Sequence, residues 1–206
     1  MKQLFIFPCN GNGLEALDSI DSSLFEFLGF IDDTPEKQGM NQLGFHVYSR
    51  NILNEFPEAL VLAVPGSPSS FQFRDEIIKS LGINFSRFAT VIHPKASISR
   101  FAKIGNNVLI MSGVVIPFNA VIEDNVCILP NSVIHHDSIV GKNTLIGSNV
   151  TVAGYTSIGS NCYIGSGTSI INNISIGDKT LVGMGTNVIK SIEENKKVVG
   201  NPAREI

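Results

Sequence analysis

The stretch that decides the fold lies in the C-terminal half of the chain, and its middle part reads VIPFNAVIEDNVCILPNSVIHHDSIVGKNTLIGSNV over residues 115–150. From Ile92 to Val188 an Ile or a Val returns at every sixth residue, without a slip or an insertion. The full set is Ile92, Ile98, Ile104, Ile110, Ile116, Ile122, Ile128, Ile134, Val140, Ile146, Val152, Ile158, Ile164, Ile170, Ile176, Val182 and Val188. Chance does not supply such a run, so the period indicates a repeated structural unit.

A six-residue period excludes a helical face, which needs about 3.6 residues per turn, and it also excludes a heptad seam. It fits a short strand and a tight turn, repeated along the chain. β-branched side chains favour the strand. The glycine that often follows the aliphatic residue, as at Gly105, Gly141 and Gly159, suits the turn because glycine tolerates unusual φ angles. A unit this small buries little surface alone, so we expect the units to stack into a solenoid.

The repeat resembles that of the hexapeptide-repeat acyltransferases, whose chain coils as a left-handed parallel β-helix. The resemblance implies a triangular coil of three hexapeptides, and a prism roughly 26 Å long at about 4.8 Å per coil. The left hand is implied by the family alone, because crossovers between parallel strands are usually right-handed.

Residues 1–88 differ in pattern, and we expect a separate α/β domain there, followed by a β-helix domain with a C-terminal tail over residues 89–206. The expected elements are a strand at Leu4–Phe7, a helix from Leu14 to about Leu24, strands at Phe27–Ile31 and Leu60–Val64, and a helix from Phe71 to Leu81. Alternating strands and helices are typical of a small parallel α/β unit.

Ligands of such a unit bind beyond the carboxyl ends of its strands. The segment Asn10-Gly11-Asn12-Gly13 follows the first strand, where glycines let the backbone approach a phosphate and the next helix offers free N–H groups. Asp32 and Asp33 follow the second strand, where an acidic side chain can accept a hydrogen bond from a ribose hydroxyl. A plain turn and an ordinary pair of capping residues are the alternative interpretations.

Two further segments, Gly29-Phe30-Ile31-Asp32-Asp33 and Val91-Ile92-His93-Pro94, extend the resemblance to nearly the whole chain. With them the chain is similar to the sugar acetyltransferases of the sialic-acid O-acetyltransferase and UDP-bacillosamine N-acetyltransferase group. That resemblance implies a Rossmann-like N-terminal domain that holds a nucleotide-linked sugar. The chain departs from the group at Pro8, where a glycine is usual, and at Pro65-Gly66-Ser67, where Gly-Asn is usual. Gly66 is the candidate substrate contact in this second turn.

The segment His135-His136-Asp137 interrupts the repeat where a glycine is common. Acyl transfer to an amine or a hydroxyl needs a base that takes the acceptor's proton, and imidazole suits this task near neutral pH. An adjacent carboxylate can orient the ring and favour its protonated form. The family motif implies that His136 is the base, that Asp137 supports it, and that His135 is at most a further polar contact. Outside this repeat, a solvated turn would be the preferred interpretation.

The resemblance also implies which acyl donor the protein uses and how its chains assemble. In the family, acetyl-coenzyme A (acetyl-CoA) lies in the groove between neighbouring prisms of a homotrimer. The motif makes Gly154 the first candidate for a donor contact, followed by Ser166 and Met184. The reaction needs no metal, and the histidines and acids show no metal-ligand spacing.

The composition of the chain argues against several classes of protein function. A net charge of -3 argues against a nucleic-acid surface, and no run reaches the 18 apolar residues of a membrane-spanning helix. The cysteines Cys9, Cys127 and Cys162 lack metal spacing, and Cys162 falls on an inward repeat position. A buried thiol there fits a reducing cytoplasm.

The sequence therefore predicts an acetyl-CoA-dependent N-acetyltransferase whose acceptor is a nucleotide-linked amino sugar. The resemblance favours a 4-amino-4,6-dideoxyhexose made for a surface glycan such as the O-antigen of lipopolysaccharide. O-acetylation of sialic acid or a related sugar is the nearest alternative, since it needs the same base and donor. A non-catalytic β-helix scaffold remains a further alternative. A metal enzyme similar to γ-carbonic anhydrase lacks its histidine triad here.

Overall fold

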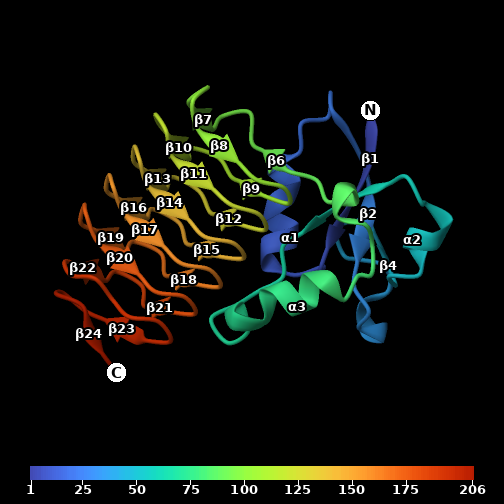
Figure 1. The fold of residues 1–206 in the computed structure, drawn as a ribbon. Helices are drawn as coiled ribbons and strands as arrows, with labels where there is room; N and C mark the ends of the chain where they lie inside the picture. Colours follow the sequence, from blue (N-terminus) through green and yellow to red (C-terminus); the bar gives the residue numbers. More distant parts are fainter.

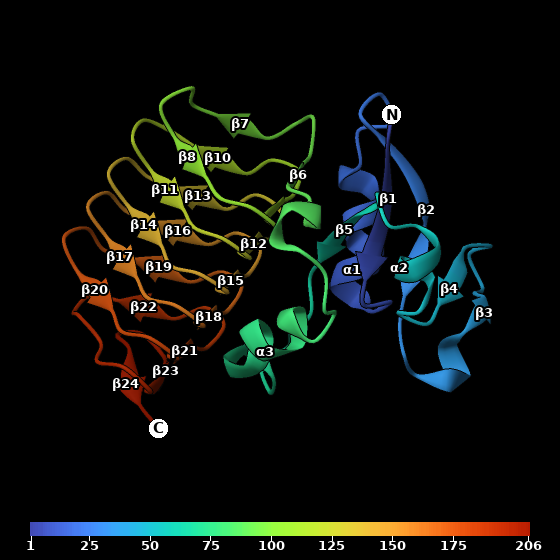
Figure 2. The ribbon, with the colours of Figure 1, turned by 45° about the vertical axis from the view of Figure 1, so that its right-hand side comes forward.

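The computed structural model describes residues 1–206 and is mainly β. Figure 1 shows a small α/β unit beside a long prism of short strands, and the turned view in Figure 2 shows successive coils stacked along one axis. The C-terminus lies at the far end of the prism from its first coils (Figure 1).

Three sheets of mostly parallel strands make the faces of the prism. The first face holds β6 (Val91–Ile92), β9 (Leu109–Ile110), β12 (Cys127–Ile128), β15 (Leu145–Ile146), β18 (Tyr163–Ile164), β21 (Leu181–Val182), β23 (Lys197–Val199) and β24 (Arg204–Glu205). The second face holds β7 (Ser97–Ile98), β10 (Val115–Ile116), β13 (Val133–Ile134), β16 (Thr151–Val152), β19 (Ser169–Ile170) and β22 (Asn187–Val188). The third face holds β8 (Lys103–Ile104), β11 (Val121–Ile122), β14 (Ile139–Val140), β17 (Ser157–Ile158) and β20 (Ser175–Ile176). The parallel β-helix predicted from the period is therefore observed.

The repeated aliphatic residues fill the interior, as the period predicts. Ile110, Ile128 and Ile164 have no exposed surface and belong to one continuous core cluster. Ile98 is only partly buried. Ile92 pairs in register with the core residue Ile110 but is 39% exposed, so it does not share the burial predicted for the repeat. It lies in the first coil, and no earlier coil covers that end of the prism.

The structure shows a different role for the repeat glycines from the one predicted, which was to allow unusual φ angles at the turns. The residue that takes a positive φ lies three positions after the aliphatic, and in most coils it is Asn, as at Asn107, Asn125 and Asn143. The glycine directly after the aliphatic has ordinary φ but lies against the next coil: a Cβ on Gly141 would come within 2.6 Å of the Gly159 carbonyl carbon. Glycine is thus required there for close backbone approach rather than for left-handed conformation.

The N-terminal unit is a five-stranded sheet in the order β3-β4-β2-β1-β5. Its strands are β1 (Lys2–Phe7), β2 (Phe25–Ile31), β3 (Gly39–Met40), β4 (His46–Tyr48) and β5 (Leu60–Ala63), and all neighbours are parallel except β3 and β4. The three predicted strands are confirmed, whereas β3, β4 and α2 (Ile52–Glu55) carried too short a pattern to be predicted. The helices are shorter than expected: α1 covers only Gly11–Glu15, and α3 covers Arg74–Lys79.

α1 packs between the N-terminal sheet and the first face of the prism (Figures 1 and 2). Leu14 and Leu17 join a cluster that also contains Leu109, Cys127 and Leu145 of the first face. The two units therefore share one apolar core.

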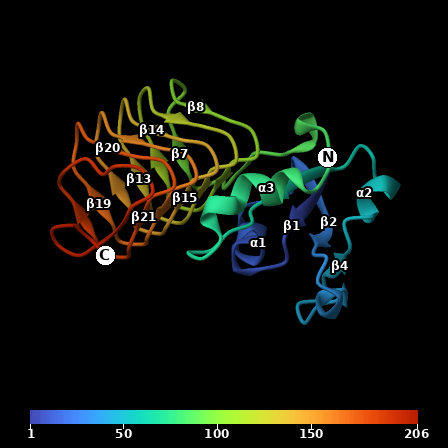
Figure 3. The ribbon, with the colours of Figure 1, turned by 60° about the horizontal axis from the view of Figure 1, so that its bottom comes forward.

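A buried arginine fixes the other end of this junction, where α3 lies along the prism (Figures 1 and 3). Arg74 is fully buried and donates hydrogen bonds to the carbonyl oxygens of Pro65, Asn125 and Asn143, the last at 2.9 Å from Nε. Burial lowers the pKa of Arg74 to about 10, so the guanidinium remains charged near neutral pH. No carboxylate pairs with it, and the carbonyl dipoles alone stabilise the charge.

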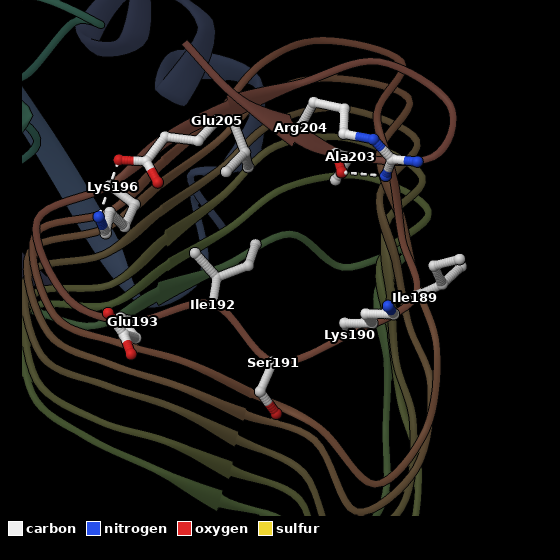
Figure 4. A pocket seen from close by; sticks show the side chains of 10 residues that line it. Ile189, Lys190, Ser191, Ile192, Glu193, Lys196, Ala203, Arg204 and Glu205 are labelled. Atoms are coloured by element: carbon white, nitrogen blue, oxygen red, sulfur yellow. Dashed lines mark hydrogen bonds and ion pairs between the residues drawn. The ribbon is translucent and has the colours of Figure 1, made fainter.

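The C-terminal residues cover the last coil, as expected for the open end of a solenoid. β24 pairs antiparallel with β23, and Ala203 packs against the core. Figure 4 looks onto this end, where a cavity of about 350 Å³ remains between the last coil and the tail. Lys196 pairs with Glu205 at its rim, at 2.8 Å between Nζ and Oε1.

Replacing Arg74 with Met tests the junction. The carbonyl oxygens of Pro65, Asn125 and Asn143 would remain buried without their donor. We expect the free energy of unfolding to fall by about 3 kcal/mol or more, because each buried acceptor left without a donor costs about 1–3 kcal/mol. Lys79→Met, on the exposed face of the same helix, is the control and should change stability by less than about 1 kcal/mol. Equal losses for both variants in urea unfolding would contradict this role.

Candidate active site

His136 lies on the corner between β13 and β14, where the chain passes from the second face to the third. Its Nδ1 lies 2.9 Å from Oδ2 of Asp137, and about half of its side chain is exposed (48%). Asp137 takes the positive-φ position of this corner, with φ at 57°. Asp tolerates this conformation better than most residues. The local fold thus places the predicted base and its carboxylate in contact.

Asp137 is held as a carboxylate by its neighbours. Asn119 Nδ2, one coil earlier on the same corner, donates to Asp137 Oδ1 at 2.6 Å. The hydrogen bonds from Asn119 and then His136 lower the pKa of Asp137 below its usual value. Because an ionised carboxylate only accepts hydrogen bonds, Nδ1 of His136 must carry the proton. The lone pair then lies on Nε2, which is free to take a proton from a ligand.

Gly154 lies directly beside the imidazole, one coil after His136. A Cβ on Gly154 would come within 2.8 Å of His136 Cε1 and 2.9 Å of Nε2, so only glycine leaves room for the ring in this position. The Gly154 N–H makes no hydrogen bond within the chain. A free backbone N–H next to a base is the arrangement that stabilises the oxyanion in acyl transfer.

His135 and the other predicted donor contacts lie apart from this pair. The His135 N–H donates to Val152 O at 2.9 Å within the second face, and its side chain makes no hydrogen bond. Ser166 and Met184 occupy the next corner, between the first and second faces, where Ser166 Oγ accepts from Ser148 N at 3.1 Å. Met184 is largely exposed. Within one chain the structure does not bring Ser166 or Met184 to Gly154.

The predicted substrate residues other than Gly13 meet at two neighbouring cavities of about 370 and 710 Å³, sizes typical of small-molecule sites. The smaller one, the inner cavity, lies between the N-terminal unit and the first face, and Gly11 and Asn12 line it. The larger one, the outer cavity, is lined by Asp32 and Asp33. Asn10, Gly66 and Ser67 line both.

Gly13 has a different role from the one expected. It is buried and lines neither cavity, and a Cβ there would come within 2.2 Å of Pro8 O. Its N–H donates to the Asn10 side chain at 2.9 Å, which caps α1. Gly11, by contrast, has open space in front of its Cα. Close approach to a ligand is therefore open to Gly11, while Gly13 serves the packing of the turn.

Both acidic residues of the outer cavity are engaged within the chain. Asp32 is 5% exposed and accepts from Lys37 Nζ at 2.8 Å and from Thr34 N at 3.1 Å. Burial raises the pKa of Asp32, but the bonds from Lys37 and Thr34 together outweigh it, so the pKa lies below its usual value. Asp33 pairs with Arg50. Their basic partners, Lys37 and Arg50, lie outside every motif recognised in the sequence.

His136 and the inner cavity lie on different sides of the prism. Each coil runs from the first face to the second and then the third, so the His136 corner is opposite the first face. The N-terminal unit packs against that first face through Leu109 and Leu145, and the inner cavity lies at this junction. The body of the prism therefore separates the inner cavity from His136 of the same chain.

Sequence reasoning missed two neighbours of the His136–Asp137 pair, Asn119 and Tyr155. Asn119 looked like any other turn asparagine, and Tyr155 carried no motif. Tyr155 stands edge-on to His136, with ring centroids 5.2 Å apart and planes at 88°. The signal that could have found both is the eighteen-residue coil, because adding or subtracting one coil from Asp137 gives these two positions.

No group of three or more His, Cys, Asp or Glu side chains is placed to hold a metal ion. None of the helices has the length and apolar character needed to cross a membrane.

Residues 88–198, more than half of the chain, match the model of the family described as the GMPPB C-terminal domain. No curated protein matches the chain.

Solved structures match over the full length. PerB from Caulobacter crescentus, in complex with CoA and GDP-perosamine, has a TM-score of 0.86 at 23% identity, over 100% of this chain and 97% of that chain. The acetyltransferase domain of PglB from Neisseria gonorrhoeae, in complex with acetyl coenzyme A, has a TM-score of 0.86 at 24% identity, over 100% and 99%. WeeI from Acinetobacter baumannii has a TM-score of 0.82 at 22% identity, over 100% of both chains. At these identities the likeness establishes a shared fold.

Adding a methyl group at Gly154 should displace the imidazole. In Gly154→Ala the new Cβ would overlap His136, so we expect the ring to turn and its bond to Asp137 to break, with little loss of thermal stability. The downfield proton signal of His136 Nδ1–H, followed in histidine-labelled protein, should disappear. Asn172→Ala, one coil further along the same corner, is the control and should leave the signal in place. A retained signal in Gly154→Ala would contradict the packing described.

Proposed function

The chain belongs to the family described as the GMPPB C-terminal domain, and we propose that it is an acetyl-CoA-dependent N-acetyltransferase acting on a nucleotide-linked amino sugar. One observation carries the proposal: His136 has its Nδ1 in contact with an ionised Asp137, and its Nε2 lies against Gly154, whose N–H makes no hydrogen bond within the chain. A base and an oxyanion donor side by side are what acyl transfer requires.

The reaction follows from these positions. The acceptor amine attacks the thioester carbonyl carbon and gives a proton to His136 Nε2. The Gly154 N–H stabilises the oxyanion, and Asp137 stabilises the imidazolium that forms. The C–S bond then breaks, and the proton on His136 passes to the leaving thiolate. The products are an N-acetylated sugar and CoA, with no acyl-enzyme.

We propose that the inner and outer cavities bind the nucleotide-linked acceptor. Gly11 leaves open space for a ligand to approach the backbone, and Gly66 lines both cavities. Asn10 and Asn12 offer amide groups, and Asp32 and Asp33 line the outer cavity with carboxylates. The structural neighbour PerB was solved with CoA and GDP-perosamine, which supports an amino sugar linked to a nucleotide. The acceptor we propose is a 4-amino-4,6-dideoxyhexose destined for a surface glycan such as the O-antigen.

The separation of the base from the cavities supports a homotrimer. If three prisms pack around a common axis, the His136 corner of one chain can face the cavities of its neighbour. Ser166 and Met184 can likewise meet acetyl-CoA in the groove, opposite Gly154 of the adjacent prism. In this assembly each site needs two chains.

The finer architecture belongs to the same proposal: a left-handed coil over residues 89–206 and a Rossmann-like domain over residues 1–88. We further propose a cytoplasmic enzyme. Burial raises the pKa of Cys127 and of Cys162 to about 11, so both remain thiols, which suits a reducing compartment. O-acetylation of a sialic acid remains the second candidate, because the same base would activate a hydroxyl.

Substitutions of His136 and His135 test which residue acts as the general base. Purified protein is assayed with acetyl-CoA and a panel of nucleotide-linked amino sugars and sialic acids, following thiol release. His136→Ala should lower kcat by about 10²–10⁴-fold, the range for general base catalysis, while acetyl-CoA affinity and assembly persist. His135→Ala should be milder. A severe His135→Ala with an active His136→Ala would place the base one residue earlier, and full activity in both would refute base catalysis at this corner.

A neutral replacement tests the role of Asp137. The hydrogen bonds from Asn119 and His136 lower its pKa, so the carboxylate stays ionised through and below its usual titration range and is an anion near neutral pH. In Asp137→Asn the anion that orients the ring and stabilises the imidazolium is lost, so kcat should fall, though less than in His136→Ala. An Asp137→Asn variant that keeps the wild-type kcat would contradict this role.

Mixing inactive variants tests the shared site. His136→Ala lacks the base, and Gly11→Trp fills the inner cavity, so each should be inactive alone. Coexpressed in equal amounts, they should recover about one quarter of the wild-type activity, because a quarter of the sites in a closed ring pair an intact base with an intact cavity. Absence of recovery, with mixed trimers present, would show that each site lies within one chain.

A further inference from the structure

Tyr155 has a backbone conformation that its side chain does not favour. Its φ is 58°, in the left-handed region, where a bulky side chain is an outlier. The other non-glycine residues with positive φ are Asn, Asp or Lys: Asn107, Asn119, Asn125, Asn131, Asp137, Asn143, Asn149, Asn161, Asn173, Lys179 and Asn195. Asn119 and Asn173 hold positions equivalent to Tyr155 on the same corner. An aromatic residue here therefore needs a reason other than folding.

Core packing does not supply that reason. The Tyr155 side chain is 60% exposed, and it belongs to none of the apolar clusters. Its ring instead stands edge-on to the His136 imidazole at 5.2 Å between centroids. Its backbone N–H donates to His136 O at 3.2 Å, which holds the two turns next to each other. Strain that is kept at a site without packing gain indicates a functional role.

We infer that Tyr155 is a positioning residue for His136. The imidazole is bounded by Gly154 beside Cε1 and Nε2, by Asp137 at Nδ1, and by the Tyr155 ring standing edge-on to it. Without the ring, rotation about the His136 side-chain bonds would be free on that side, and Nε2 would spend less time beside the Gly154 N–H. The inference rests on the proposed function, since it concerns the orientation of the proposed base.

The test uses Tyr155→Asn, which installs the residue found at the equivalent corners. We expect the melting temperature to rise because the left-handed strain is relieved, and kcat to fall about tenfold or more with the KM for acetyl-CoA unchanged. Tyr155→Phe keeps the ring and should retain most of the rate. Lys179→Asn relieves the same strain on another corner, and it should raise the melting temperature without changing kcat.

A measurement made without substrate, the tautomeric state of His136, tests this inference independently of the proposed function. In nitrogen-15 histidine-labelled protein, His136 should show one tautomer, protonated at Nδ1, and Tyr155→Asn should show a mixture. If that change occurs but no acceptor is acetylated, the positioning role stands and the proposed function fails. If Tyr155→Asn keeps both the tautomer and kcat, or if Tyr155→Phe loses as much as Tyr155→Asn, the positioning role of the ring is overturned.

Discussion

A left-handed residue at nearly every corner is the constraint on which the prism depends. Each strand contributes two residues, and the backbone must then turn sharply while its neighbours above and below stay within hydrogen-bonding distance. Asn and Gly meet this requirement at most corners. At the corner of His136 it is met by Asp137, a residue that tolerates the conformation and also carries a charge. The fold therefore provides a place for a carboxylate beside the base without a special loop.

The stacking of the coils then brings the other residues of the candidate site next to His136 and Asp137. Residues one coil apart lie next to each other on a corner, which brings Asn119 to Asp137 and Gly154 to His136. The hydrogen bonds that lower the pKa of Asp137 arise in this way. The residues of the candidate site at this corner thus come from three successive coils rather than from one segment of sequence.

The inner and outer cavities depend on a different interaction, the buried guanidinium of Arg74. By binding the Pro65 carbonyl and two carbonyls of the prism, Arg74 holds the Gly66 turn against Leu145, where a Cβ on Gly66 would come within 2.8 Å of that side chain. The N-terminal unit and the prism consequently form one body around the inner cavity. His136 remains on the other side of the prism, and this separation is the reason we proposed a site formed by two chains.

The sequence alone determined the prism, its aliphatic core and the His136–Asp137 pair, because a strict six-residue period and adjacent residues in one turn are local signals. It also predicted the three main N-terminal strands. Ile92 departed from the pattern because burial depends on whether another coil covers it. The tertiary structure decided that Gly13 packs against Pro8, that Asp32 and Asp33 are paired with Lys37 and Arg50, and that Tyr155 stands against the base. The Asp33–Arg50 and His136–Tyr155 contacts join residues of separate strands or coils, whose placement in space no local pattern encodes. The Gly13–Pro8 and Asp32–Lys37 contacts lie within single turns, but they depend on a backbone path that no recognised motif specified.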